Sequence, residues 1–530
     1  MSAPKVEIRR RRSVAFFAVL AATMVIASYT VVLLLAAMCV FLPYFFLAHS
    51  DTFNMQILGM LLFGIVIAAT MLWSLVPRRE KFEAPGMLLD RSAHPRLFAE
   101  LENIANALNE PLPREIYLIG APNAFVADRG GVMGFGSRRI MGLGLPLLSL
   151  LTVSQFRAVL AHEFAHYYGG DTSLGPWVYK TKSSIVRVFE NIGSVREVAR
   201  IAVLGVMYFV VTMLLKWYFI GFLRVINLIS RKQEYRADEL ACLIAGRQNL
   251  IDGLQSIHRA AVSWTVYWKQ EIAPRVSEGS LPAVGDGFQR FVIAPAVSSE
   301  ISKNLSQRLQ EQKIQPYDTH PPLRDRITAA RNVPETFTPL ETEPASSLLD
   351  NLSATELKFV ETCVPDVRPG FLKYVPWEDV ARQVTIPSWQ KFVNEYPEPL
   401  RGVTAGLVPD HVSKFPEIGS RIRDSKGMLL SPPQRTARAG FLFASALALA
   451  MIRCGWKLQI QPAVFRMWRG DEQFNPFDAI NKLMTAKLSR QDWQARCSAL
   501  EISELLLLCD PEEAAVQLQA EMFSVDTSKT

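Results

Sequence analysis

Two long apolar runs near the amino terminus constrain the fold most, because a water-soluble domain could not bury them both. Residues 14–47 form the first run and residues 57–75 the second. The first run exceeds the ~20 residues that one membrane-spanning helix needs. A cleaved signal peptide is the alternative, but its apolar core would be only about 7–15 residues long. We therefore predict two spans, at about residues 14–42 and 57–75, with Pro43 ending or bending the first helix.

Basic residues flank the two runs on the same side. Arginines at positions 9–12 precede the first run, and Arg78, Arg79 and Lys81 follow the second, whereas residues 49–56 between the runs contain neither Lys nor Arg. The positive-inside rule places the basic side in the cytoplasm. We therefore predict an integral protein of a bacterial inner membrane, with everything after the hairpin facing the cytoplasm. The cysteines are scattered and form no C-x-x-C pair, which is typical of reduced thiols.

Net charge and motif content argue against two classes of partner, nucleic acids and nucleotides. The net charge of +7 is modest, and much of it lies beside the apolar runs, so we expect no nucleic acid. The glycine-rich residues 130–144 are not followed by Gly-Lys-Ser/Thr, so we expect no nucleotide. The apolar fraction of 49% instead favours the lipid bilayer as a partner.

Residues 162–166 spell His-Glu-Phe-Ala-His. Histidines four residues apart lie on one face of a helix, so the imidazoles of His162 and His166 can converge on one ion. Glu163 beside them can hold a water on that ion. This is the H-E-x-x-H arrangement of zinc peptidases. The pair Thr152 and Gln155 predicts a capping box that starts the helix.

A third ligand is needed for such an ion, and an acidic pair lies downstream. Glu234 and Asp238 are one helical turn apart, so one carboxylate could bind zinc while the other orients a ligand histidine. The alternative for this run is a solvated, charged helix face.

The whole set of motifs resembles a known family. The sequence His-Glu-Phe-Ala-His, then Glu234-x-x-x-Asp238, then His320-Pro321-Pro322, is similar to the membrane-anchored gluzincins that contain the HtpX heat-shock proteases and the CAAX prenyl proteases. Asn123-Ala124-Phe125 resembles that family's edge-strand motif, and Gly170-Asp171 the segment after its metal helix. The similarity covers roughly residues 84–333.

The resemblance implies a role for each matching residue. Zn²⁺ would be held by His162, His166 and Glu234, with Glu163 as the general base. Asp238 and Asp171 would support the ligands without touching the ion, and His320 would stand near the oxyanion. An alternative for His320 is a structural role in ordering the Pro321-Pro322 turn. The substrate would lie along Asn123, Ala124 and Phe125.

The expected fold is mainly α with a small β-sheet, as an α+β zincin-type catalytic domain. We predict a transmembrane hairpin at residues 1–80, a metallopeptidase domain at 81–333, a linker at 334–346 and a helical accessory domain at 347–530. In the catalytic domain, residues 94–109 favour a helix, and residues 115–119 and 123–127 favour strands. In the accessory domain, residues 440–452 and 500–508 favour helices.

The apolar segment 201–229 must leave Glu234 on the same membrane side as His162, so it crosses an even number of times. Two crossings need more apolar residues than this segment has, and it contains Lys216 and Arg224. We therefore expect it to lie against the bilayer. The alternative is a full hairpin that recruits flanking residues.

Two functions from different classes follow. The first is a membrane-anchored zinc endopeptidase that hydrolyses membrane or misfolded proteins, using a zinc-activated water and Glu163 as general base. The second is a membrane scaffold with a structural or dormant zinc site and a partner-binding C-terminal domain. A CAAX-type processing enzyme would need a lipid-accessible chamber, which two clear spans hardly provide.

Overall fold

The computed structural model describes residues 13–50, 54–76, 82–130, 136–167, 175–194, 202–310, 320–336, 339–422 and 431–508. The chain falls into two units. One contains Met1–Thr265 and Ser299–Val367, and the other contains Val266–Ser298 and Arg368–Thr530. This division differs from the expected boundary at residues 334–346. A segment from the middle of the chain joins the second unit, and residues 347–367 stay with the first.

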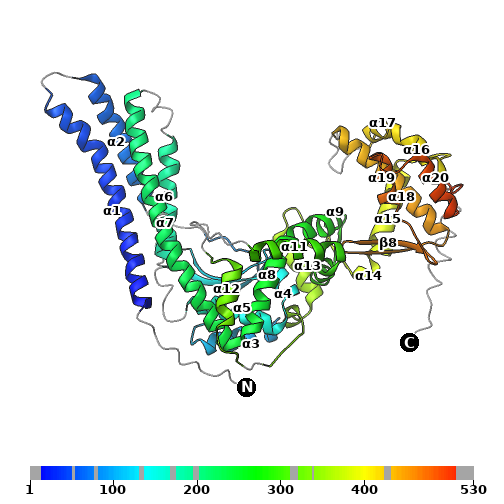
Figure 1. Cartoon of the computed structure of the whole chain (residues 1–530), viewed down its shortest axis with the longest axis horizontal. Helices are drawn as coiled ribbons and strands as arrows, with labels where there is room; N and C mark the ends of the chain where they lie inside the picture. The colour runs from blue at the N-terminus through cyan, green and yellow to red at the C-terminus, as the bar shows by residue number, and fades with distance from the viewer. Residues whose placement is uncertain are drawn as a thin grey trace. The chain divides into compact units, whose positions relative to one another are not determined.

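Both amino-terminal apolar runs form long helices that lie side by side (Figure 1), α1 (Ser13–Ala48) and α2 (Met55–Leu75). Each is long and apolar enough to cross a membrane. Helix α2 begins at Asn54, whose side chain accepts a hydrogen bond from the amide of Gln56 at 2.8 Å. Helix α1 passes through Pro43 and ends six residues beyond residue 42, because a proline removes only one main-chain donor.

A second pair of helices packs on the first. Helix α7 (Ala202–Ala245) includes the described part of segment 201–229, and α6 (Gly175–Ser194) precedes it. Asn191 of α6 donates a hydrogen bond to the Ser74 hydroxyl of α2 at 2.8 Å. Buried side chains from all four helices form one cluster that includes Val32, Cys39, Ile67, Met71, Val188, Ile192, Val211 and Leu215. The described part of segment 201–229 therefore packs in a bundle of four helices, as the alternative of a second hairpin requires, and its position relative to the bilayer stays a prediction.

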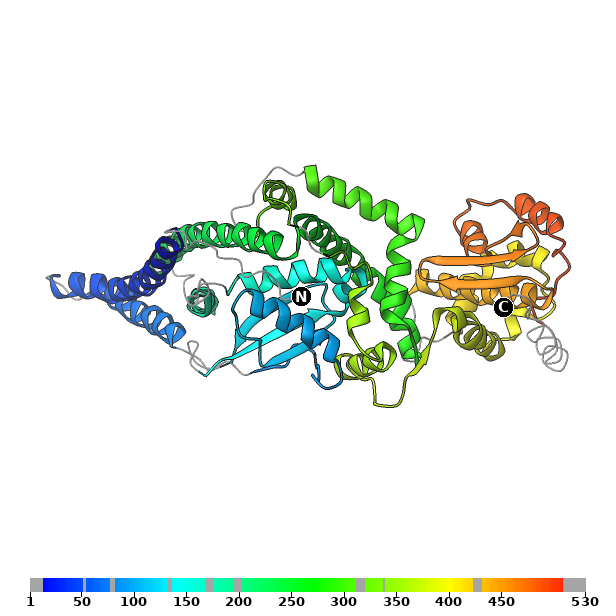
Figure 2. The same ribbon diagram turned by 90° about the horizontal axis from the view of Figure 1, so that it is seen from below.

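A four-stranded sheet follows the hairpin in the first unit. Its strands are β1 (Met87–Leu88), β2 (Glu115–Ile119), β3 (Ala124–Arg129) and β4 (Arg138–Gly144), in the order β1-β2-β4-β3. Strands β2 and β4 are parallel, and the other pairs are antiparallel. The predicted strands at residues 115–119 and 123–127 are thus confirmed, and β3 lies at an edge. Figure 2 shows the sheet beside helix α5 (Val153–Ala165), which packs against β3.

Helix α5 is fixed at its start by local sequence and by its neighbours. The predicted capping box is present, because Thr152 and Gln155 each accept a hydrogen bond from the other's amide at 3.2 Å. Arg157 donates two hydrogen bonds, of 2.7 and 2.8 Å, to the carboxylate of Glu100 in helix α3 (Pro95–Ala107). Most α5 side chains are buried, so the helix is held rigidly between the sheet and α7.

The second unit is mainly helical but contains strands that the sequence did not predict. Helix α18 (Pro432–Arg453) is its buried centre, which confirms the apolar helix expected at residues 440–452. Strands β7 (Lys457–Gln461), β8 (Val464–Arg469) and β9 (Glu472–Gln473) form an antiparallel sheet. The helix expected at residues 500–508 is wrong, because α20 (Arg490–Ala499) ends before it and Leu506 bridges to Thr404.

The remaining α-helices and strands complete the described chain. They are α4 (Leu145–Leu150), α8 (Arg247–Tyr267), α9 (Ala273–Ser277), α10 (Val284–Ile293), α11 (Pro295–Gln310), α12 (Leu323–Arg331), α13 (Leu352–Cys363), α14 (Trp377–Val380), α15 (Ile386–Glu395), α16 (Val408–His411), α17 (Phe415–Ser420), α19 (Pro476–Met484), β5 (Ser280–Pro282) and β6 (Lys373–Val375). Strands β5 and β6 pair in parallel.

Candidate metal centre

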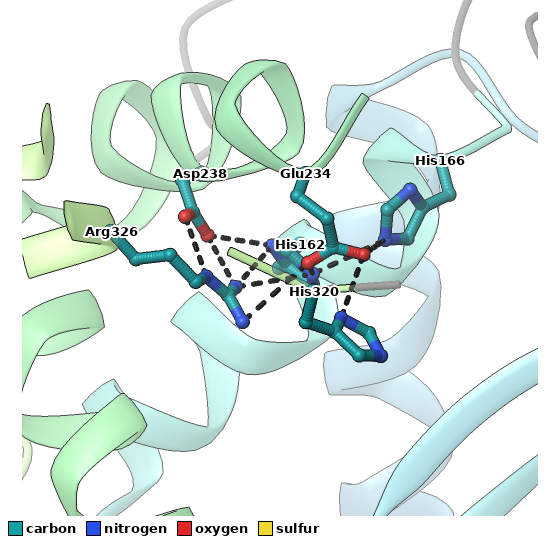
Figure 3. Close-up of polar contacts among 6 residues, drawn as sticks. All are labelled: His162, His166, Glu234, Asp238, His320 and Arg326. Atoms are coloured by element: carbon teal, nitrogen blue, oxygen red, sulfur yellow. Dashed lines mark hydrogen bonds and ion pairs between the residues drawn. The ribbon is translucent and has the colours of Figure 1, made fainter. Parts of the chain in front are cut away.

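Two helices and the segment before a third bring the predicted polar residues to one point (Figure 3). Helix α5 contributes His162, and His166 caps its carboxyl end on the same face; α7 packs along α5 with Glu234 and Asp238 one turn apart. The segment before α12 adds His320. The contact of α5 with α7 thus brings together histidines and a glutamate that lie far apart in the sequence.

The atoms of three side chains face one another at the spacing of ligands. His162 Nε2 lies 3.2 Å from His166 Nε2 and 3.6 Å from Glu234 Oε2. His166 Nε2 lies 3.5 Å from Glu234 Oε1. Ligand atoms at about 2.0–2.1 Å from a tetrahedral zinc are about 3.3 Å from one another. The observed spacings are close to this value, so one ion could bind between the three groups.

The environment of Glu234 gives an independent test of fit. Its side chain is buried, and Oε2 has no hydrogen-bond partner among the described residues. A buried carboxylate oxygen without a donor is costly unless a cation satisfies it. Burial alone would raise the pKa of Glu234, but the hydrogen bond from His320 and the charges of His162 and Arg326 lower it to about 2. The carboxylate is therefore ionised and fits a metal ligand.

The two histidines also suit metal binding. Burial, with the charge of His162, lowers the pKa of His166 to about 3, so its imidazole is neutral and has a free lone pair. Nδ1 of His162 lies 2.9 Å from Asp238 Oδ1. Donation from this nitrogen to Asp238 leaves Nε2 as the acceptor that faces His166 and Glu234.

A buried arginine supports Asp238. Arg326 of α12 binds the carboxylate with two parallel bonds, from Nε at 2.8 Å and from Nη2 at 2.6 Å. Its Nη1 lies 3.5 Å from Glu234 Oε2. Burial opposes ionisation of Asp238, but the bonds from Arg326 and His162 hold its pKa well below the usual range. Arg326 therefore fixes Asp238, and through it the orientation of His162.

His320 contacts one of the candidate metal ligands. Its Nδ1 is 3.0 Å from Glu234 Oε1, although its side chain is 67% exposed. This hydrogen bond to Glu234 raises the pKa of His320. The residue thus joins the buried cluster to the surface, where its imidazole can contact a bound molecule. Its expected place near the oxyanion stays a prediction.

Glu163 lies next to His162 on helix α5, and ionisable side chains around it affect its pKa. Burial raises its pKa to about 7, and the charge of Glu234 adds to the rise, while His162, Arg326 and His320 oppose it. A carboxyl group with a pKa near neutrality can both accept and return a proton. This agrees with the general-base role expected from the motif.

The remaining predicted residues lie on or beside strand β3, or outside the described residues. Asn123 is exposed just before the strand, while Ala124 and Phe125 begin it. The ring of Phe125 covers Gly142, where any Cβ would lie 2.4 Å from the ring. Asp171 lies outside the described residues.

Arg326 was missed by sequence reasoning. It follows His320 by six residues on the helix that Pro321-Pro322 starts, but Arg324 on the same helix is an equal candidate by sequence. Only the packing of α12 on α7 turns Arg326 inward and leaves Arg324 exposed.

Comparison with known proteins identifies a family and similar proteins. Residues 92–333 match the model of peptidase family M48. "Protease HtpX homolog 2" of Methanosarcina mazei is 25% identical over 304 residues, which are 56% of this chain and 91% of that protein. "Protease HtpX" of Psychrobacter sp. (strain PRwf-1) is 29% identical over 165 residues, 29% of this chain and about half (52%) of that protein. The crystal structure of S. mikatae Ste24p aligns over 60% of this chain and 66% of that chain, with 16% identity and a TM-score of 0.25.

Proposed function

Because residues 92–333 belong to peptidase family M48, we propose that this chain is a membrane-anchored, zinc-dependent endopeptidase. Its substrates would be membrane or misfolded proteins at the cytoplasmic side of a bacterial inner membrane. The observation that carries the proposal is the convergence of His162, His166 and Glu234, with Glu163 on the same helix turn.

Each residue has a part that its surroundings support. His162, His166 and Glu234 would hold Zn²⁺, and Asp238 with Arg326 would keep His162 in the required tautomer. When bound, zinc would lower the pKa of a coordinated water to about 7 and polarise the scissile carbonyl.

Glu163 would carry the proton. With a pKa of about 7, its carboxylate can accept a proton from the attacking water at neutral pH and then give it to the leaving amine. His320, whose exposed imidazole contacts Glu234, would donate to the oxygen on which negative charge develops.

The Glu163→Gln variant tests this function. Glutamine keeps the size of the side chain but cannot accept the proton, so we expect casein cleavage to fall by about 10²-fold or more while the zinc content stays the same. Purified full-length protein is assayed for casein cleavage, and zinc is measured by elemental analysis. Glu239→Gln is the matched control, because Glu239 is exposed on α7 beside the buried Asp238. Cleavage by Glu163→Gln at the unsubstituted rate would reject the mechanism.

A further inference from the structure

Strand β3 is the open edge of the four-stranded sheet beside the metal centre. It pairs with β4 on one side, and no other strand of the described residues pairs with its second side. An open edge presents main-chain groups to which an extended peptide can add as a further strand. The length of edge that is free therefore limits how much of a peptide can pair with β3.

The register of the sheet decides which β3 residues face this edge. The carbonyl of Arg139 in β4 accepts a hydrogen bond from the amide of Arg114 at 3.2 Å, on the β2 side. Main-chain groups alternate along a strand, so Met141 and Leu143 also face β2. Val126 pairs with Met141, and Ala124 pairs with Leu143. The main-chain groups of Ala124 and Val126 therefore point away from β4, to the open edge.

One of these two positions is already occupied by a side chain. The hydroxyl of Tyr167, the residue directly after His166, donates to the carbonyl oxygen of Val126 at 2.8 Å. The guanidinium of Arg139 lies over the tyrosine ring at 4.3 Å. Arg139 in turn lies 3.7 Å from the carboxylate of Asp128 and 3.6 Å from that of Glu110. These contacts hold the ring against the edge.

We propose that Tyr167 is a specificity-determining residue that closes the edge of β3 at Val126. A peptide can then pair its main chain with Ala124, but it must leave the strand before Val126 or displace the tyrosine hydroxyl. The inference rests on the proposed function, since it takes β3 as the strand along which substrate lies. The expected substrates are peptides that form main-chain hydrogen bonds with only a short part of β3.

Binding of nested peptides tests the proposal without relying on activity. Tyr167→Phe, made in the Glu163→Gln background, removes the hydroxyl and keeps the ring under Arg139. Fluorescein-labelled tetrapeptide and octapeptide from one unstructured segment of casein are titrated by anisotropy against full-length, zinc-loaded protein. We expect the ratio of octapeptide to tetrapeptide affinity to rise about threefold to tenfold, the effect of one additional main-chain hydrogen bond. An unchanged ratio would overturn the proposal.

Two further variants keep the result interpretable. Tyr117→Phe is the matched control, because Tyr117 donates to Glu115 at 2.7 Å on β2, which is paired on both sides, and its ratio should stay unchanged. Arg139→Met frees the Tyr167 ring and should raise the ratio in the same direction. Failure of peptides to bind any variant would also overturn the proposal, because β3 would then receive no substrate.

The proposed function is judged separately, by casein cleavage with Glu163 intact. Cleavage by the unsubstituted chain together with an unchanged binding ratio would reject the role of Tyr167 alone. A changed ratio without cleavage would support the closed edge and reject the endopeptidase.

Discussion

Charge balance at the metal centre explains why its residues tolerate burial. Glu163, Glu234 and Asp238 meet one guanidinium, that of Arg326, so two formal negative charges remain when all three carboxyls are ionised and His320, which contacts Glu234, is neutral. A divalent cation between the ligands would neutralise this excess. Arg326 binds Asp238 through two short bonds and comes no closer than 3.5 Å to Glu234 Oε2, which leaves that oxygen without a hydrogen bond from the described residues and available to an ion.

Arg326→Met should therefore damage both stability and metal binding. The change leaves Asp238 as a buried carboxylate without its bidentate partner, which costs about 3–5 kcal/mol when a buried pair is broken. It also loosens the orientation of His162, so zinc affinity should fall about 10- to 100-fold. Thermal unfolding and competition with a zinc chelator measure the two effects.

Arg324→Met is the control for this change. Arg324 lies on the same helix two residues earlier and is exposed, so the same substitution should alter neither unfolding nor zinc affinity. Equal zinc affinity in Arg326→Met and the unsubstituted protein would contradict the supporting role of Arg326.

Some residues of the candidate centre could be predicted from the sequence, whereas others could not. His162 and His166 are predicted from helical spacing, because residues four apart lie on one face of a helix, and Glu163 is predicted from its place in the H-E-x-x-H pattern. Glu234 required the family resemblance, since an acidic pair on a helix is usually solvated. Arg326 and Tyr167 have no local pattern. Their roles arise from the contact of α12 with α7 and of α5 with β3, which are long-range packing events.

At the scale of elements, α7 links the membrane bundle to the metal centre. Its first half packs among α1, α2 and α6, and Tyr218 bonds the hydroxyl of Ser28 in α1 at 2.8 Å. The same helix then presents Glu234 and Asp238 to α5. A shift of α7 against the bundle would therefore also move Glu234, a proposed metal ligand.

The α1–α2 contact depends on one glycine. A Cβ at Gly64 would lie 2.1 Å from the carbonyl oxygen of Cys39, so the two helices can approach this closely only without a side chain there. Gly64→Ala should force the helices apart and destabilise the bundle by about 1–3 kcal/mol. Thermal unfolding in detergent measures the loss. Gly59→Ala is the matched control on the same helix, because a Cβ there meets nothing within 4 Å. Equal melting temperatures for the two variants would show that the close approach does not stabilise the bundle.

At the scale of the whole molecule, the two units are interleaved along the chain, which sequence could not show. The proline-rich residues 334–346 looked like a boundary, but Glu343 accepts a hydrogen bond from the amide of Val153 at 2.9 Å, and so helps to fix the start of the metal helix. Residues 266–298 belong to the second unit, where the carbonyl of Ala283 accepts from the Trp377 indole at 2.8 Å. Truncation at residue 347 would therefore remove Trp377 and leave Ala283 without its partner.

The membrane helices could be predicted from sequence only where a helix is apolar along its whole length. Apolar length and basic flanks predicted the helices α1 and α2, because a span has a fixed length. The same rule predicted that segment 201–229 was too short for a hairpin. It did not anticipate that α6, with Lys180, Lys182 and Arg187, would supply the second helix by packing on α2. Arg187 donates a hydrogen bond to the Ser184 hydroxyl at 2.7 Å, and Asn191 donates one to Ser74 of α2 at 2.8 Å, so polar side chains of this helix find partners within the bundle.

We expect two hairpins, α1–α2 and α6–α7, to enter the membrane from the cytoplasmic side, with the rest of the first unit and the whole second unit on that side. The native cysteines provide reporters, because Cys363 in the first unit and Cys454 in the second are exposed. In a Cys509→Ser background, a membrane-impermeant maleimide should label both in inside-out vesicles and neither in right-side-out vesicles. His49→Cys, placed at the exposed end of α1, should give the opposite pattern. Labelling of Cys363 or Cys454 in sealed right-side-out vesicles would contradict this topology. It would also place the peptidase unit, or the second unit, outside the compartment in which we expect its substrates.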